Sequence, residues 1–357
     1  MQNETMPASN NGNSSTQEVA DGVAYMQTQI VNLFMVKEPN AANNSWVLVD
    51  TGMPGNAGRI KQAAAERFGK DSRPSAIILT HGHFDHVGTV KELANEWDVP
   101  VYAHQLEMPY LTGRSDYPPP DPTVGGGMMA CLSFLYPKHP INLGERVQVL
   151  PSDGSVPGMT GWRWIHTPGH APGHVSLFRD SDRTLIAGDA FVTTKQESAL
   201  AVLTQKQEVH GPPMYFTPDW EEARRSVEKL AELQPSVAAT GHGVPMRGET
   251  MLRELEGLAR DFENRAMPAH GRYVGHPART NERGIVSLPP PVADPLPKIL
   301  AGVGLAAVAG AALLAVSNRN KDSGSSMGDM LESTYGYCYF TMSTLRQYKS
   351  GAQWIGR

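Results

Sequence analysis

The stretch Thr80-His81-Gly82-His83-Phe84-Asp85-His86-Val87-Gly88 decides how this chain is interpreted. It places three histidines and one aspartate within six residues. A strand-like apolar run over 76–79 leads into it and a helix-like run over 87–97 leaves it, so it lies on a strand-to-helix loop, where α/β proteins commonly carry their chemistry. Imidazole and carboxylate are ligands that zinc prefers. The stretch therefore predicts a metal site rather than a histidine-rich surface loop.

Strand-like and helix-like segments continue on both sides of this motif. Alternating or continuous apolar runs predict strands, and apolar residues spaced three and four apart predict helices. The expected strands lie within 24–37 and at 46–49, 76–79, 100–104, 147–150, 162–166, 175–178, 184–187 and 237–240, and the expected helices at 59–68, 87–97, 220–233 and 251–263. Two halves of similar content predict two sheets packed face to face with helices outside.

The composition is that of a globular protein with a sizeable core. The chain has 357 residues, of which 40% are hydrophobic and 19% charged. A net charge of -5 argues against a nucleic-acid binder, which usually shows a basic face. Cys131 and Cys338 lie far apart and neither belongs to a C-x-x-C pair, so we expect no disulfide framework and no thiolate metal site. The expected partner is a small-molecule substrate.

The chain is expected to divide into five parts. An Asn- and Ser-rich lead-in over 1–19 has the composition of a disordered segment and lacks the pattern of a signal peptide. A catalytic domain follows, then a proline-containing linker, an apolar helix and a tail. These occupy residues 20–265, 266–298, 299–316 and 317–357.

The apolar run over 299–316 predicts a transmembrane helix. Its 18 residues contain no charged side chain, and at ~1.5 Å each they give about 27 Å of helix against a hydrocarbon core of ~30 Å. We therefore expect a membrane-associated protein whose catalytic domain is cytoplasmic; the alternative is a soluble cytoplasmic protein in which this helix is buried or peripheral. Gly302, Ala306 and Gly310 are spaced four apart, which would let two such helices pack in a homodimer.

Three further loops offer metal ligands downstream of the motif. His170, Asp189 and His242 each follow or adjoin a strand-like run, and a glycine precedes each of them. Glycine lets the backbone bend tightly, so side chains from separate loops can converge. Together with the motif, these loops supply enough histidine and aspartate for two metal ions, and Asp189 could bridge them.

Two regions could contact the substrate. The segment 108–140 is long and rich in Gly and Pro, which is typical either of a lid or binding loop or of a variable surface loop. Tyr215 could donate a hydrogen bond to a leaving group, although it could equally pack beside Pro212-Pro213. Lys195 could meet an anionic substrate; the alternative is a solvated lysine.

Five motifs follow one another along the chain: Asp50-Thr51-Gly52, the H-x-H-x-D-H run at 81–86, Thr167-Pro168-Gly169-His170, Gly188-Asp189 and Gly241-His242-Gly243. Their order is the one seen in the metallo-β-lactamase superfamily, which the chain resembles over about residues 23–263. The resemblance implies an α/β fold, a four-layer αββα sandwich, to which we add the single C-terminal apolar helix. It also implies a pair of zinc ions, with iron or manganese as alternatives.

The resemblance further implies roles for individual residues. One metal site would comprise His81, His83 and His170, and a second Asp85, His86 and His242, with Asp189 shared. Asp50 would orient ligand imidazoles, and His174 would support the site without binding metal.

The family includes several reactions, and the sequence narrows them. The redox diiron branch of the family places Glu where this chain has His83, and its lactonases place Tyr where this chain has Val192. The resemblance thus implies a zinc-dependent hydrolase of a small ester, lactone or thioester, with Asp85 as the catalytic proton carrier. A mono-iron enzyme similar to persulfide dioxygenases and a phosphodiesterase remain alternatives, as does a non-catalytic scaffold.

Overall fold

The structure is a computed structural model that describes residues 15–38 and 45–292. The chain divides into two compact units, 1–294 and 295–357, and every described residue belongs to the first. The expected apolar helix, the tail and most of the lead-in lie outside the described residues and stay predictions. None of the helices in the described ranges combines the length and the hydropathy that a membrane crossing needs.

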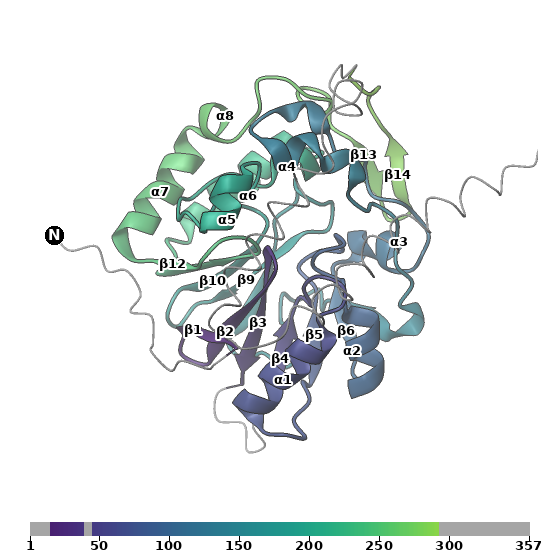
Figure 1. The fold of residues 1–357 in the computed structure, drawn as a ribbon, viewed down its shortest axis with the longest axis vertical. Helices are drawn as coiled ribbons and strands as arrows, with labels where there is room; N and C mark the ends of the chain where they lie inside the picture. Colours follow the sequence, from purple (N-terminus) through teal and green to yellow (C-terminus); the bar gives the residue numbers. More distant parts are fainter. Residues whose placement is uncertain (1–14, 39–44, 293–357) are drawn as a thin grey trace, which may run out of the picture. The chain divides into compact units, whose positions relative to one another are not determined.

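The first sheet has seven strands in sequence order (Figure 1). They are β1 (Gln17–Ala20), β2 (Val23–Thr28), β3 (Val31–Lys37), β4 (Trp46–Val49), β5 (Ala76–Ile78), β6 (Val101–Ala103) and β7 (Val147–Val149). The pairs from β1 to β4 are antiparallel, and those from β4 to β7 are parallel. Parallel neighbours need crossover connections, which α1 (Ala57–Phe68) and α2 (Val90–Trp97) provide. Both helices bury one apolar stripe, spaced three or four residues apart.

The second sheet has five strands in the order β12-β11-β10-β9-β8. They are β8 (Trp162–His166), β9 (Val175–Arg179), β10 (Thr184–Gly188), β11 (Val237–Thr240) and β12 (Met246–Arg247). The crossover between the parallel strands β10 and β11 contains α6 (Trp220–Glu232), and α7 (Gly248–Arg260) follows β12. Asp219 begins α6 as its N-cap, with its side chain accepting the Glu222 N–H.

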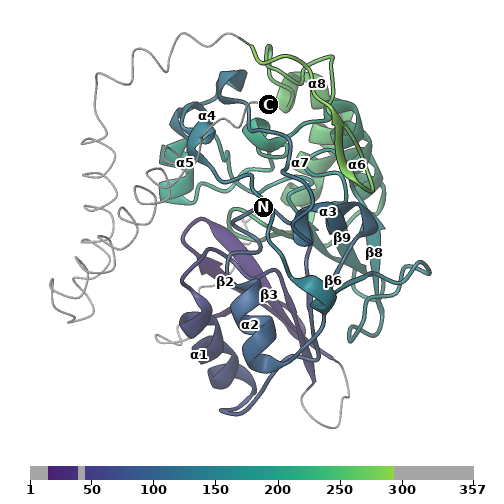
Figure 2. The ribbon, with the colours of Figure 1, turned by 90° about the vertical axis from the view of Figure 1, so that its right-hand side faces the viewer.

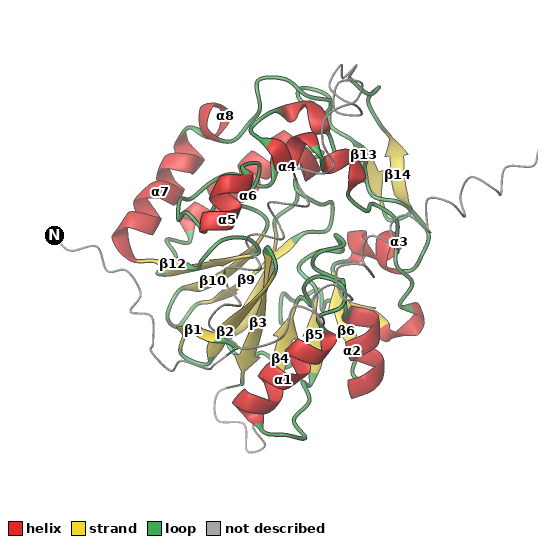
Figure 3. Cartoon of the chain, in the orientation of Figure 1, coloured by secondary structure: helices red, strands yellow, loops and turns green. Residues whose placement is uncertain are grey.

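Three hydrophobic clusters define four layers (Figures 2 and 3). The first lies between α1, α2 and the first sheet, and the second lies between α6, α7 and the second sheet. The third lies between the two sheets, where Phe34 and Ile78 of the first share a cluster with Leu177 and Ile186 of the second. The chain therefore forms the expected αββα sandwich.

Short elements fill the connections. The segment 108–140 contains α3 (Met108–Leu111), η2 (Pro122–Val124), α4 (Met128–Cys131) and η3 (Ser133–Leu135). The others are η1 (Gln105–Glu107), η4 (Gly144–Arg146), α5 (Ala199–Thr204), η5 (Met214–Phe216), α8 (Phe262–Arg265) and the hairpin of β13 (Arg279–Asn281) with β14 (Gly284–Ser287).

Some expected boundaries were wrong. β1 begins at Gln17, inside the expected lead-in over 1–19, because Val19 is buried and the strand pairs with β2. α2 begins at Val90 rather than at residue 87, since the motif itself forms turns. The first part of the expected linker over 266–298 is not a linker, because Ala266, Tyr273 and Ala278 are buried in the cluster on α6 and α7.

Trp46 provides a test of the helix-to-sheet packing. It is fully buried, its ring stacks on Phe68 at 4.6 Å and meets Trp97 edge-on at 5.8 Å, and its Nε1–H donates to Ser72. We expect Trp46→Ala to lower the free energy of unfolding by about 3–5 kcal/mol, measured by urea titration followed by circular dichroism. Leu200→Ala, at a side chain 70% exposed, is the control and should leave the midpoint almost unchanged. Equal midpoints for the two variants would contradict this packing.

Candidate metal centre

The candidate ligands converge because they follow the carboxyl ends of strands. Asp50 follows β4 and the motif follows β5, while Asp189 and His242 follow β10 and β11. These strands are parallel neighbours within their sheets, so their carboxyl ends meet at one edge of each sheet. His170 reaches the same place from the loop after β8.

The structure brings all seven predicted ligands together in one buried cluster, the metal cluster. Its members are His81, His83, Asp85, His86, His170, Asp189 and His242. They form three groups whose potential ligand atoms lie within 4.8 Å of one another, so each group could hold a metal ion. The groups are His81, His83 and His170; Asp85, His86 and His242; and His81, His86 and Asp189.

The Asp189 carboxylate faces the group of His81, His83 and His170 as well as the group of Asp85, His86 and His242. Its Oδ2 atom lies 3.4 Å from His170 Nε2, 3.5 Å from His86 Nε2 and 3.1 Å from His242 Nε2. One carboxylate oxygen is thus surrounded by imidazoles of two different groups. A carboxylate in this position could be shared between two cations, one held by each group.

Several buried polar atoms of the metal cluster lack a hydrogen-bond partner among the described residues. They are His81 Nε2, His86 Nε2, His170 Nδ1 and Asp189 Oδ1. A buried polar atom left unsatisfied costs about 1–3 kcal/mol, so native folds seldom gather several at one point. Cations within the cluster would satisfy these atoms, which shows that the residues fit divalent metal.

Hydrogen bonds from outside the cluster fix two of the imidazoles. His86 Nδ1 lies 2.8 Å from Asp50 Oδ2, and His242 Nδ1 lies 2.7 Å from the carbonyl oxygen of Ile30. Both oxygens only accept, so each Nδ1 must donate its hydrogen. In a neutral ring the Nε2 lone pair is then left free, and it points into the cluster, as in metal-binding histidines generally.

The two groups with separate histidines, His81–His83–His170 and Asp85–His86–His242, differ in how their surroundings shift the imidazole pKa. Burial and neighbouring imidazoles lower the pKa of His81 and His170 well below the usual value, and burial lowers that of His83 to about 3. Burial also opposes a charge on His86, but the carboxylates of Asp189, Asp50 and Asp85 outweigh it and raise its pKa well above the usual value. The group of His81, His83 and His170 therefore presents neutral imidazoles. Most of the negative charge lies around the other group, that of Asp85, His86 and His242.

Asp50 and His174 contact the metal cluster without joining the three groups. Asp50 has a left-handed backbone, with φ of 59°, and its carboxylate also accepts the N–H and O–H of Thr80 at 2.8 and 2.7 Å. His174 Nε2 accepts the backbone N–H of Asp189 at 2.8 Å, and its Nδ1 lies 2.9 Å from Thr167 Oγ1. Both side chains thus hold residues of the metal cluster in place: Asp50 the imidazole of His86, and His174 the backbone of Asp189.

Of the two expected substrate contacts, Tyr215 lies beside the metal cluster. Its ring lies 5.3 Å from that of Phe216, which stacks on His83 at 4.7 Å. The Tyr215 side chain is buried, and its hydroxyl has no hydrogen-bond partner within the described ranges. Lys195 is half-buried, and among the described residues its ammonium forms no hydrogen bond or ion pair with a member of the metal cluster.

The segment 108–140 borders the cluster. Tyr117 lies 4.6 Å from the His83 ring, and Tyr136 lies 6.0 Å from Phe84 of the motif. We had not singled out Tyr117, nor Glu107, whose carboxylate accepts the backbone N–H of Gly82 in the motif. One signal could have indicated Glu107, because it lies in the short η1 that follows the carboxyl end of β6, at the sheet edge to which Asp50 also belongs.

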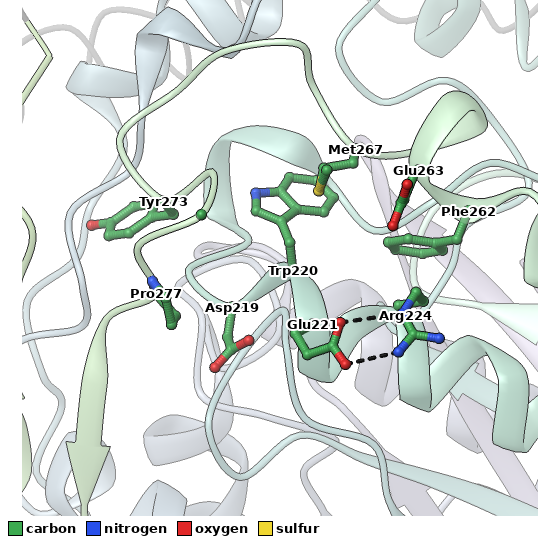
Figure 4. A pocket seen from close by; sticks show the side chains of 10 residues that line it. Asp219, Trp220, Glu221, Arg224, Phe262, Glu263, Met267, Tyr273 and Pro277 are labelled. Carbon is green, nitrogen blue, oxygen red and sulfur yellow. Dashed lines mark hydrogen bonds and ion pairs between the residues drawn. The ribbon is translucent and has the colours of Figure 1, made fainter.

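Two cavities elsewhere on the second sheet's side contain no cluster residue. The larger, of about 230 Å³, is lined by Trp220, Phe262 and Tyr273 together with Arg224, which pairs with Glu221 (Figure 4). The other lies behind the His170 loop, against Pro168 and Pro172, and has about 210 Å³.

Comparisons with known proteins agree with this geometry. A family model described as the metallo-beta-lactamase superfamily matches residues 28–242. The chain is 52% identical to "Probable metallo-hydrolase YflN" of Bacillus subtilis over 68% of this chain and 91% of that protein. It is 30% identical to "Probable metallo-hydrolase YybB" of the same organism over 55% of this chain and 74% of that protein.

A further relative is "Hydroxyacylglutathione hydrolase GloC" of Haemophilus influenzae. It is 27% identical over 48% of this chain and 70% of that protein. The family model spans more than half of the chain and reaches from β2 to His242, so it includes every residue of the metal cluster. This chain belongs to the metallo-beta-lactamase superfamily and is a metal-dependent hydrolase.

Proposed function

We propose that the chain uses two zinc-class ions to hydrolyse a small ester, lactone or thioester, with a thioester as the first candidate. The observation that carries the proposal is the pair of three-ligand groups, both of which contact the Asp189 carboxylate. The name of the Haemophilus influenzae relative, a hydroxyacylglutathione hydrolase, supports a thioester.

The residues divide between the two ions as follows. His81, His83 and His170 would hold the first ion, Asp85, His86 and His242 the second, and Asp189 both. Such ions supply Lewis acidity, which lowers the pKa of water toward ~7 and polarises a carbonyl oxygen. Iron or manganese would suit the same nitrogen and oxygen ligands.

Asp85 is the proposed proton carrier. It is the most exposed member of the metal cluster, at 8%, so it lies nearest to an entering substrate. Its Oδ2 lies 3.4 Å from His242 Nε2, and burial raises its pKa. A carboxyl group with a raised pKa can take a proton from the attacking water and return it to the leaving group.

Tyr215 is the proposed hydrogen-bond donor to the substrate. Burial raises its pKa well above the usual value, so the phenol stays protonated. Among the described residues its hydroxyl is not engaged, and the carboxylates of Asp85 and Asp189 lie close enough to act on its ionisation. Phe84, Tyr136 and Phe216 would pack against the substrate beside it and exclude water.

The metal content of the purified chain tests the ligand assignment. We expect about two divalent ions per chain, because each three-ligand group suffices for one, and about one ion in His170→Ala, measured by elemental analysis. His139→Ala is the control, since this side chain is 66% exposed and pairs only with Asp116 among the described residues. A single iron per chain, in protein produced with ample zinc, would contradict the proposal and favour the mono-iron alternative.

The reaction is tested by comparing ester, lactone, thioester and phosphodiester substrates. We expect turnover of the carboxylic acid derivatives and little of the phosphodiesters. Asp85→Ala should abolish that turnover while the far-ultraviolet circular dichroism stays native, because it removes a metal ligand and the proton carrier together. Phosphodiesters as the preferred substrates would refute the proposed substrate class.

Tyr215→Phe tests the role of one hydroxyl. We expect kcat/KM on the best substrate to fall roughly tenfold to a hundredfold, since an aligned donor is lost from the site. The metal content should remain at the wild-type value. Tyr273→Phe is the matched control, because its hydroxyl donates to the carbonyl oxygen of Pro119 and so is already engaged elsewhere. Unchanged kinetics in Tyr215→Phe would remove this residue from the mechanism.

A further inference from the structure

A buried carboxylate that the reaction does not use lies between two loops of the metal cluster. Glu107 is fully buried and belongs to η1, which follows the carboxyl end of β6. A buried carboxylate is costly unless hydrogen bonds compensate it. Its partners therefore indicate what it does.

Glu107 accepts hydrogen bonds from both loops. Its Oε2 atom accepts the backbone N–H of Gly82 at 2.9 Å, and its Oε1 atom accepts the backbone N–H of Gly173 at 2.7 Å. The hydroxyl of Tyr117 also donates to Oε2. One side chain thus joins the loop that carries His81 and His83 to the loop that carries His170.

The two glycines allow the carboxylate to approach this closely. A Cβ atom at Gly82 would lie 2.5 Å from Tyr117 Oη, and one at Gly173 would lie 2.8 Å from both the Glu107 backbone nitrogen and its Cγ. A larger residue at either position would push the loop away from Glu107. The packing therefore fixes the separation of the two loops as well as their hydrogen bonds.

Tyr117 connects this arrangement to a ligand directly. Its ring lies 4.6 Å from the His83 ring and stacks on Tyr110 at 3.9 Å. The Gly82 N–H also lies 2.9 Å from Tyr117 Oη, so it is shared between the phenol and the carboxylate. The phenol thus contacts both the backbone and one imidazole of the motif.

We propose that Glu107 is a positioning residue that holds His81, His83 and His170 at the separation one metal ion needs, and that Tyr117 assists it. This inference rests on the proposed function, because it assumes that these three imidazoles bind metal. The second group, of Asp85, His86 and His242, has different outside partners in Asp50 and Ile30. Glu107 joins two loops that both carry ligands of the first group, so its effect should be greater on that ion than on the other.

An amide cannot replace this carboxylate. Three donors converge on two carboxylate oxygens, and glutamine offers only one oxygen, so its NH₂ group would face a donor. The loops would move apart even though the side chain keeps its size. Loss of an outer partner of a metal ligand typically costs 10–100-fold in metal affinity.

The test is zinc binding to the metal-free full-length chain, titrated against a chromophoric chelator. The wild type should bind two equivalents. In Glu107→Gln one equivalent should weaken by about 10–100-fold, and the other should weaken much less. With cobalt as the probe, the visible spectrum of the weakened equivalent should change. The metal-free variant should keep a native far-ultraviolet circular dichroism spectrum, even if the mismatched donors lower its unfolding midpoint. A weakening that falls on one zinc equivalent in a folded chain is what a merely structural role would not predict.

Asp121→Asn is the matched control. Asp121 is also a buried carboxylate that accepts two backbone N–H groups, those of Thr123 and Arg272, but it contacts no loop of the metal cluster. It should leave both zinc affinities unchanged. If Glu107→Gln fails to fold, Tyr117→Phe decides, with a smaller weakening expected of the same single equivalent.

The outcomes separate the two proposals. A wild-type chain that binds no divalent ion would refute the proposed function itself. The positioning role alone would be refuted if the wild type binds two equivalents but Glu107→Gln leaves the zinc affinities and the cobalt spectrum unaltered. The same holds for Tyr117→Phe where that variant decides. Equal weakening of both equivalents would refute it too, because Glu107 joins the two loops that carry His81, His83 and His170.

Discussion

The burial of an ionisable cluster is the constraint on which the rest of this structure depends. Five imidazoles and two carboxylates lie within a few ångströms of one another and are almost entirely shielded from solvent. Solvent water cannot hydrogen-bond to these buried groups, so the protein must fix each one by a hydrogen bond or by packing. The partners come from every side: Asp50 for His86, Ile30 for His242 and His174 for the backbone of Asp189.

The sandwich makes this possible because it separates stability from chemistry. The three hydrophobic clusters bury the faces of both sheets, while the metal cluster lies only at the carboxyl ends of the strands. Loops at such an edge can change without loss of core packing. The segment 108–140 illustrates this: it contributes Tyr117 and Tyr136 beside the motif, yet most of its residues lie outside the two sheets' cores.

Sequence alone predicted the features that are local or repeat a simple rule. The motif at 81–86 is dense enough to indicate metal by itself, and Asp189 and His242 follow strand-like runs. Glu107 was missed because its contacts with Gly82 and Gly173 join three distant segments. The linker expected over 266–298 rests on the prolines at 289–291, 295 and 297. Scattered apolar residues ahead of them, such as Tyr273, show no periodic pattern and are buried only against the folded helices. For Tyr215 the sequence left substrate contact and packing open, and its burial in η5 beside Phe216 comes from the fold.

The backbone of Asp50 has a consequence for which sequences can carry this site at all. At φ of 59° a position accepts glycine, asparagine or aspartate with least strain. Glycine would remove the acceptor of His86 Nδ1–H, and asparagine can offer only one oxygen to the three donors from His86 and Thr80. Conformation and chemistry together thus reduce the choice at this position to one amino acid. A designer who grafts the His86 side of this centre onto another scaffold must copy that left-handed turn as well as the ligands.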